Sequence, residues 1–182
     1  MSDHGDGEPL AAGIADSIAD ALERAGLPDR LYGLVLAYSL GDLSAYTWPL
    51  FACTRAAMLA QGEEPYALWD PSWARAEQLP PGMSEDLPDR DLRVPLPHGK
   101  AYAEYRGQPR DDPAALERVA RLWRDVAAVL TRRRWSESAV TDDFVALAYP
   151  NEWREADVVE ALRASLGPDR FAAFAARGWV PQ

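Results

Sequence analysis

Four side chains that can recognise or react with a ligand crowd into residues 66–73, namely Tyr66, Trp69, Asp70 and Trp73. Trp69 and Trp73 are four positions apart, so their indoles would approach each other on a helical turn capped by Asp70. A buried indole normally needs an acceptor for its N–H. The cluster therefore predicts either an aromatic lock at the edge of the core, which we favour, or, together with Trp48, an apolar cleft for a partner side chain or a flat ligand.

The sequence contains few residues of the types that usually form catalytic or metal sites. The chain has 182 residues but only two histidines, one cysteine and one lysine, and most acid–base, nucleophilic and metal sites depend on these types. The sequence contains no glycine-rich phosphate loop, nucleophile elbow, cysteine pair or His-Glu-x-x-His motif. We therefore predict no catalytic residue, no metal site and no cofactor.

His98 and two adjacent aspartates are the remaining candidates. A single histidine in a proline-flanked loop is usually exposed, so His98 is kept as a candidate binding residue, with a catalytic role as the less favoured alternative. Neighbouring residues of a strand point to opposite faces, so Asp142 and Asp143 cannot easily share a proton or a metal ion. We expect these aspartates to form the polar entry to a strand.

The first part of the chain predicts a helix followed by two strands. Residues 9–26 place apolar side chains at fourfold spacing and end in glycine, which indicates an amphipathic helix. Residues 31–38 are apolar almost throughout, as in a central strand covered on both faces. A turn leads to a second strand over 44–53, so we expect a hairpin, and Pro49 favours an edge position or a bulge.

The middle of the chain is predicted to be poor in regular structure. Thr54 is a suitable N-cap for a short helix over residues 55–60. Prolines at 80, 81, 88, 95, 97 and 109 then interrupt the sequence. They should break any long element and leave a loop-rich segment with at most one short strand near residues 101–105.

The clearest helix begins at Asp112 and Pro113, which supply a cap and a favoured first residue. Its apolar stripe recurs every three or four positions as far as Leu130, and a pair between Glu117 and Arg121 is expected on the opposite face.

A strand and two helices should complete the chain. Residues 144–149 predict a third strand. Asn151 is the expected cap of a further helix, which Gly167 and Pro168 should break before a last short helix over residues 169–177.

These elements predict a mixed α/β (α+β) fold, with a small, mainly antiparallel sheet of about three to five strands packed with about four to five helices. Residues 1–8 are expected to be disordered, and residues 9–182 to form one domain with a proline-rich loop segment at 79–112. The N-terminus lacks the features of a signal peptide, and no apolar run approaches the ~20 residues that span a bilayer. This favours a cytoplasmic location.

The charge is negative and unevenly distributed. The formal net charge is −10, and residues 1–91 carry 16 acidic against 5 basic side chains, whereas residues 92–182 carry 13 against 14. An acidic surface repels nucleic acid and anionic membranes and speeds encounter with a basic partner. We therefore predict a basic protein partner and neither a nucleic-acid nor a membrane partner, with solubility alone as the alternative reason for the charge.

The order of these elements resembles a known bacterial family. The motifs that carry the resemblance are Leu31-Tyr32-Gly33-Leu34-Val35-Leu36, Leu68-Trp69-Asp70-Pro71-Ser72-Trp73 and Asp143-Phe144-Val145-Ala146-Leu147-Ala148. On these motifs, residues 9 to about 178 resemble the bacterial domain of unknown function 4303, and the segment 79–112 departs from the pattern. The resemblance implies a compact α/β domain, supplies no catalytic residues, and by analogy of fold and size suggests a small accessory or immunity-type protein.

Two functions from different classes fit this pattern. The first, which we favour, is a non-enzymatic binding protein of the immunity or accessory type, whose acidic half meets a basic protein partner with Trp48, Trp69 and Trp73 as anchors. The second is a small enzyme with an aromatic-lined pocket of roughly 300 Å³ or more. In that enzyme a carboxylate such as Asp70 or Asp143 would lie in the pocket and act as the base.

Overall fold

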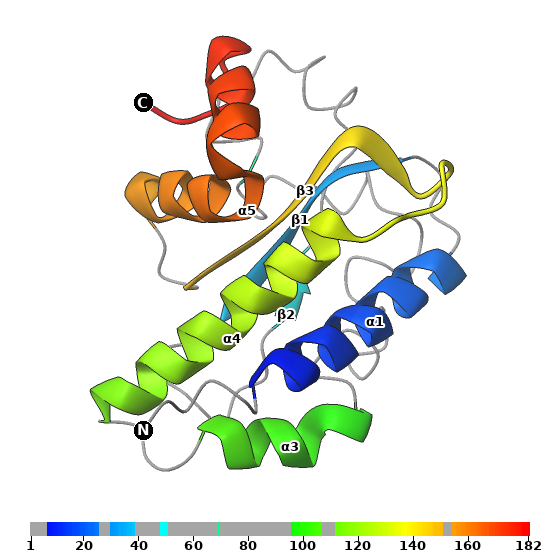
Figure 1. The fold of residues 1–182 in the computed structure, drawn as a ribbon, viewed down its shortest axis with the longest axis vertical. Helices are drawn as coiled ribbons and strands as arrows, with labels where there is room; N and C mark the ends of the chain where they lie inside the picture. Colours follow the sequence, from blue (N-terminus) through cyan, green and yellow to red (C-terminus); the bar gives the residue numbers. More distant parts are fainter. Residues whose placement is uncertain are drawn as a thin grey trace.

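The computed structural model describes residues 7–25, 30–38, 48–50, 69, 96–106, 112–150 and 154–182. The described helices are α1 (Gly7–Ala25), α3 (Leu96–Arg106), α4 (Pro113–Arg132) and α5 (Glu155–Ala176), and the strands are β1 (Leu31–Tyr38), β2 (Trp48–Leu50) and β3 (Val140–Pro150). The expected mixed class, helices with a small sheet, is confirmed (Figure 1). Gly7 and Glu8, expected in a disordered N-terminus, belong to α1, and the helix expected over 55–60 lies outside the described residues.

β1 is the middle strand of the described sheet, whose order is β2-β1-β3. It pairs antiparallel with β2 and parallel with β3, so its central position and its antiparallel pairing with the next strand are confirmed. Pro49 lies in β2, at an edge of this described sheet, as expected. The expectation of a mainly antiparallel sheet is wrong. The long pairing is parallel, because the chain between β1 and β3 crosses over and returns through helices before β3 begins.

Different elements cover the two faces of the sheet. α1 and α4 lie side by side, with α3 across their ends, and pack with Leu36 of β1 into one core (Figure 1). α5 packs with Val35 of β1 into a second core on the opposite face. Leu36 and Val35 are both buried. Burial on both faces is the reason that residues 31–38 are apolar without alternation.

α4 begins where the sequence predicts. Asp112 is the N-cap and its Oδ1 accepts a hydrogen bond from the N–H of Ala114 at 3.0 Å, while Pro113 is the first helical residue. The predicted stripe is buried from Val119 to Leu130. The expected pair of Glu117 with Arg121 is wrong, since Glu117 accepts from Arg124, two turns further along the helix.

α3 occupies part of the segment that was expected to be loop. The prediction of a proline-rich loop over 79–112, with at most a strand near 101–105, is wrong for residues 96–106. Pro97 lies in the first turn, where its missing N–H costs no intrahelical hydrogen bond. Tyr102 is buried, and its ring centroid lies 5.9 Å from that of Trp123 of α4. Packing against neighbouring helices therefore stabilises α3, rather than a periodic pattern of its own.

α5 bends at a glycine, as expected. Gly167 has φ 71° and ψ 172°, a conformation that favours glycine, and the two halves of α5 run in clearly different directions (Figure 1). The start of the helix differs from the expectation. Arg154 is the N-cap and its N–H donates to Asp157 Oδ2 at 2.6 Å, whereas the expected cap, Asn151, lies outside the described residues.

The side chain of Thr131 on α4 forms hydrogen bonds with the backbone of β3 at Ala146. The hydroxyl of Thr131 accepts from the N–H of Ala146 at 2.9 Å and donates to the carbonyl of the same residue at 3.2 Å. Both residues are buried, so water does not replace these bonds easily.

Thr131→Val should therefore lower the free energy of unfolding by about 1–3 kcal/mol, because it leaves the two backbone groups of Ala146 buried and unsatisfied. Thr131→Ser, which keeps the hydroxyl, should cost less. Chemical denaturation measures both changes. A valine variant as stable as the wild type would contradict this role of the hydroxyl.

Candidate functional site

A cleft opens at the carboxyl ends of the two parallel strands. Tyr38 ends β1 and Pro150 ends β3 at the same edge of the sheet, the edge beside which α/β proteins bind ligands. The N-terminal halves of α4 and α5 flank the opening, which has a volume of about 310 Å³. We call it the carboxyl-edge cleft, and its lining residues are Tyr38, Pro113, Leu116, Glu117, Ala120, Arg124, Ala148, Tyr149, Pro150, Asp157, Glu160 and Ala161.

The charged side chains of the cleft are mostly acidic. α4 contributes Glu117 and Arg124, and α5 contributes Asp157 and Glu160. Three carboxylates thus meet one guanidinium, which gives the four groups a formal charge of −2. The rest of the lining is aliphatic or aromatic apart from the Tyr38 and Tyr149 hydroxyls. Such a surface combines an apolar floor with acceptors at its rim.

Arg124 links the two helices loosely. Its guanidinium lies 2.7 Å from Glu117 on its own helix and 3.9 Å from Glu160 on α5. The side chains of Arg124, Glu117 and Glu160 are 35%, 56% and 72% exposed, so both contacts are surface ion pairs worth about 0–1 kcal/mol each. A second cation can therefore compete for these carboxylates at little cost.

Tyr38 brings a phenol hydroxyl to the cleft. The residue is 6% exposed, and among the residues that the structure describes no group forms a hydrogen bond with its hydroxyl. Burial raises the pKa of this phenol above its ordinary value of 10.0, Arg124 partly opposes the rise, and the three cleft carboxylates add to it. The hydroxyl is therefore neutral at physiological pH and can both donate and accept a hydrogen bond.

A pH titration can check the environment of Tyr38. The tyrosinate absorbance that Tyr38→Phe removes should belong to a step above pH 10.0. Because the folded-state pKa exceeds the unfolded one, the group's contribution to stability is complete below pH 10.0 and is lost as pH rises through the folded pKa. Tyr38→Phe should accordingly lose less stability than the wild type over that alkaline range. If the step that disappears in Tyr38→Phe lies at or below pH 10.0, the phenol is solvated instead.

The residues predicted for binding do not come together at this cleft. Tyr66, Asp70 and Trp73 lie outside the described residues. Trp48 begins β2 at the sheet edge, and only its backbone position is described. The remaining two, Trp69 and His98, are described with their side chains and contact different parts of the fold.

Trp69 is a core residue. It is 2% exposed, its ring stacks on Phe174 with centroids 6.1 Å apart, and it meets the ring of Tyr32 edge-on at 5.6 Å. Its Nε1 donates to the carbonyl of Trp179 at 2.6 Å, and its own carbonyl accepts from the hydroxyl of Tyr149 at 2.5 Å. The aromatic lock that we favoured describes Trp69 correctly. Its alternative role as a binding residue needs correction, because a fully packed indole offers no surface to a partner.

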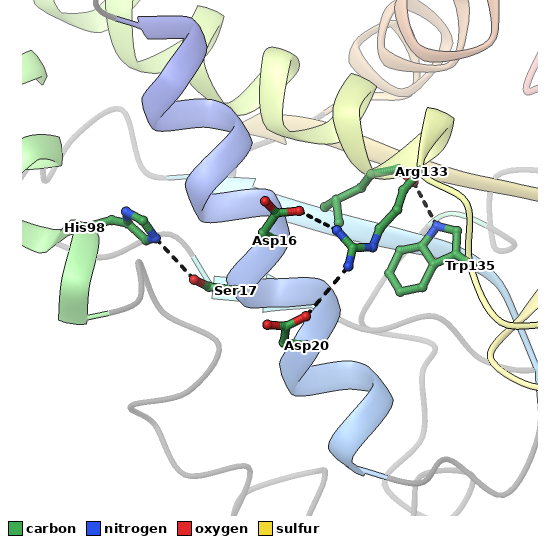
Figure 2. A network of polar contacts seen from close by, with 7 residues as sticks. Asp16, Ser17, Asp20, His98, Arg133 and Trp135 are labelled. Atoms are coloured by element: carbon green, nitrogen blue, oxygen red, sulfur yellow. Dashed lines mark hydrogen bonds and ion pairs between the residues drawn. The ribbon is translucent and has the colours of Figure 1, made fainter.

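His98 connects two helices. Its Nε2 lies 3.1 Å from the hydroxyl of Ser17, so α3 is tied to α1 at this point (Figure 2). The expectation of an exposed loop histidine is wrong, since His98 is half-buried on α3. A serine and a histidine at this distance can act as nucleophile and base, but Ser17 lies in mid-helix, where the backbone N–H groups are used within α1 and cannot stabilise an oxyanion. We therefore assign this pair a packing role.

Gly13 permits the close approach of His98. A Cβ at this position would lie 2.6 Å from Cε1 of the imidazole. Gly13→Ala should therefore push α3 away and lower the free energy of unfolding by about 1–3 kcal/mol, despite the higher helix propensity of alanine. The double variant Gly13→Ala/His98→Ala should recover part of the loss. Thermal unfolding measures the cycle, and additive effects of the two substitutions would contradict the contact.

Part of the acidity of α1 is neutralised within the fold. Arg133, which follows α4, contacts Asp16 and lies 3.6 Å from Asp20 (Figure 2). Its guanidinium also lies 5.8 Å from the ring centroid of Trp135. The two aspartates thus share one internal cation, which leaves these three groups a formal charge of −1, compared with −2 for the four charged groups of the carboxyl-edge cleft.

Within the described ranges, no group of three His, Cys, Asp or Glu side chains is arranged to hold a metal ion. No helix in this part of the chain is long and apolar enough to cross a membrane. No family model, curated protein or solved structure matches the chain. The resemblance to the domain of unknown function 4303 stays a prediction.

Sequence reasoning missed Tyr38, Arg124 and Glu160 as site residues. The position of Tyr38 could have indicated a site. It is a polar residue at the carboxyl end of a predicted central strand, where α/β proteins bind ligands. The expected antiparallel sheet concealed it. In such a sheet the ends of residues 31–38 and 144–149 need not lie together, whereas the parallel pairing brings them to one edge.

Proposed function

We propose that this chain is a non-enzymatic binding protein, of the accessory or immunity type, that receives a basic side chain of a protein partner in the carboxyl-edge cleft. One observation carries the proposal: three carboxylates and one guanidinium surround an otherwise largely apolar opening of about 310 Å³. The aliphatic stem of an arginine or lysine can lie on the apolar floor while its charged head reaches the carboxylates. The partner is therefore expected to be basic at the contact.

The charge of the whole chain supports the same partner. A formal net charge of −10 attracts a basic protein at long range and raises the rate of encounter. The cleft then supplies the short-range contact, since Glu160 and Glu117 are exposed and can pair with an incoming cation. Trp48 and Trp73 remain predicted anchors of this proposal, and Trp69 is withdrawn from it because it is buried.

A binding titration tests the proposal. Acetylated hexalysine amide with a fluorescent label should bind the wild type, and the affinity should fall as salt is added, because the contact is electrostatic. The variant Glu117→Gln/Glu160→Gln should bind several-fold more weakly. Glu8→Gln/Glu137→Gln changes the net charge equally at exposed sites away from the cleft and should bind nearly as the wild type does.

Two outcomes would overturn this assignment. Equal weakening in both double variants would mean that only the overall charge attracts the peptide. No binding of the peptide at low salt would remove the basis for a basic partner. Circular dichroism of each variant confirms that it is folded before the comparison is made.

The size of the cleft also favours a second candidate, the small enzyme with a carboxylate base, because the volume reaches that of a small-molecule site. The acids expected for that role do not support it. Asp143 lies elsewhere, 2.6 Å from the hydroxyl of Thr141 and 3.5 Å from Arg177, and Asp70 lies outside the described residues. Two tyrosines, rather than the tryptophans expected, provide the aromatic lining.

A further inference from the structure

The hydroxyl of Tyr38 is unusual among the polar groups of the cleft. It belongs to a residue that is 94% buried, yet it forms no hydrogen bond within the described part of the chain. The Tyr38 oxygen is not one of the side-chain atoms that are both buried and unsatisfied, so it is reached from the cleft and can hydrogen-bond a ligand there. The tyrosine lines the same opening as the four charged side chains, so a ligand held by the carboxylates can reach it.

The carboxylates of the cleft differ in the hydrogen bonds and ion pairs that they already form within the protein. Glu117 accepts from Arg124 at 2.7 Å, whereas Glu160 lies 3.9 Å from the same guanidinium. Asp157 uses Oδ2 to accept from the N–H of Arg154. Glu160 and the Oδ1 atom of Asp157 therefore offer acceptor positions in the same cleft as the Tyr38 oxygen, and these acceptors come from two elements, β1 and α5.

The chemistry of these acceptors distinguishes the two basic side chains. A guanidinium is planar and carries five N–H donors in a fixed fork, so it can reach a phenol oxygen and two carboxylates at once. An ammonium is a compact charge that holds its hydration strongly and has three donors on one atom. The set of acceptors suits the guanidinium better.

We propose that the carboxyl-edge cleft selects an arginine side chain of the partner over a lysine, through the Tyr38 hydroxyl, and that Arg124 competes with that side chain for Glu160. The inference rests on the proposed function. Arg124 occupies the cleft in the free protein and is released toward Glu117 alone when the partner arginine binds. It therefore weakens binding, although it lines the site.

Labelled hexaarginine and hexalysine amides of equal length test the selectivity. The wild type should bind hexaarginine roughly fivefold more tightly, the ratio that one additional net hydrogen bond gives. Tyr38→Phe, which removes only the hydroxyl, should weaken the binding of hexaarginine more than that of hexalysine and so reduce the preference to near unity. Arg124→Gln should tighten the binding of both peptides by roughly two- to fivefold, the size of a surface ion pair, whereas Arg121→Gln on the exposed face of α4 should tighten it less.

The outcomes separate this inference from the function on which it rests. Equal binding of the two peptides, both sensitive to Glu117→Gln/Glu160→Gln, overturns the arginine selectivity and leaves the basic partner in place. A preference for arginine that persists in Tyr38→Phe also overturns the inference, because the selectivity then arises elsewhere. No binding of either peptide overturns the proposed function as well.

Discussion

Trp69→Ala should lower the free energy of unfolding by about 3–5 kcal/mol. The indole is 2% exposed and contacts Phe174 and Tyr32, so its removal leaves a cavity between β1 and α5. The substitution also removes the hydrogen bond that the indole N–H donates to the carbonyl of Trp179 in the C-terminal segment. Denaturant unfolding followed by circular dichroism gives the change directly.

Trp69→Phe is the matched control for this prediction. It keeps an aromatic ring in the core and loses the N–H, so it should be clearly less destabilising than the alanine variant. A loss below about 1 kcal/mol for Trp69→Ala, the range of surface substitutions, would contradict the packed position of the indole.

Gly33→Val should also be strongly destabilising, by about 1–3 kcal/mol or more. A Cβ at position 33 of β1 would lie 3.0 Å from Cζ3 of Trp69 and 3.5 Å from the carbonyl oxygen of Val145. Valine has a high strand propensity, so a propensity argument alone predicts a gain. The ring of Trp69 lies against the bare backbone of Gly33, and the added methyl groups would displace it.

The combination of the two substitutions tests whether they share one contact. In the Trp69→Ala background the ring is gone, so Gly33→Val should cost far less than it does in the wild type and can fill part of the cavity. Thermodynamic coupling between neighbouring sites is expected to be 0.5–3 kcal/mol, roughly. Additive losses in the double variant would contradict the direct contact between residues 33 and 69.

Local signals predicted much of the fold. Asp112 and Pro113 mark the start of α4 because a cap and a first-turn proline act within a few residues, and Gly167 marks the bend in α5 for the same reason. The continuous apolar run of β1 predicted its central position, because a strand covered on both faces needs no polar alternation.

Features that depend on distant parts of the chain were not predictable in this way. The direction of pairing between β1 and β3 follows from how the long connection packs, and neither strand encodes it. α3 has no periodic apolar face of its own and depends on the ring of Trp123. Its prolines therefore suggested a loop, although Pro97 lies in a turn that tolerates it.

The candidate site also depends on distant parts of the chain more than on local sequence signals. Trp69 attracted attention as an aromatic residue in a cluster, and the cluster's local spacing could not tell a core contact from a binding surface. The cleft instead forms from Tyr38, Arg124 and Glu160, which three separate elements bring to one edge. Once the sheet is known to be parallel, the position of Tyr38 at the end of β1 becomes informative.

Mapping the binding site of a basic peptide tests the role of the carboxyl-edge cleft. Isotopically labelled protein would be titrated with hexaarginine amide, and the backbone amide resonances followed by NMR. The largest shifts should occur at Tyr38, Ala120 and Ala161, which line the carboxyl-edge cleft. Shifts concentrated on α1 around Asp16 and Asp20, with the cleft resonances unchanged, would contradict this role of the cleft.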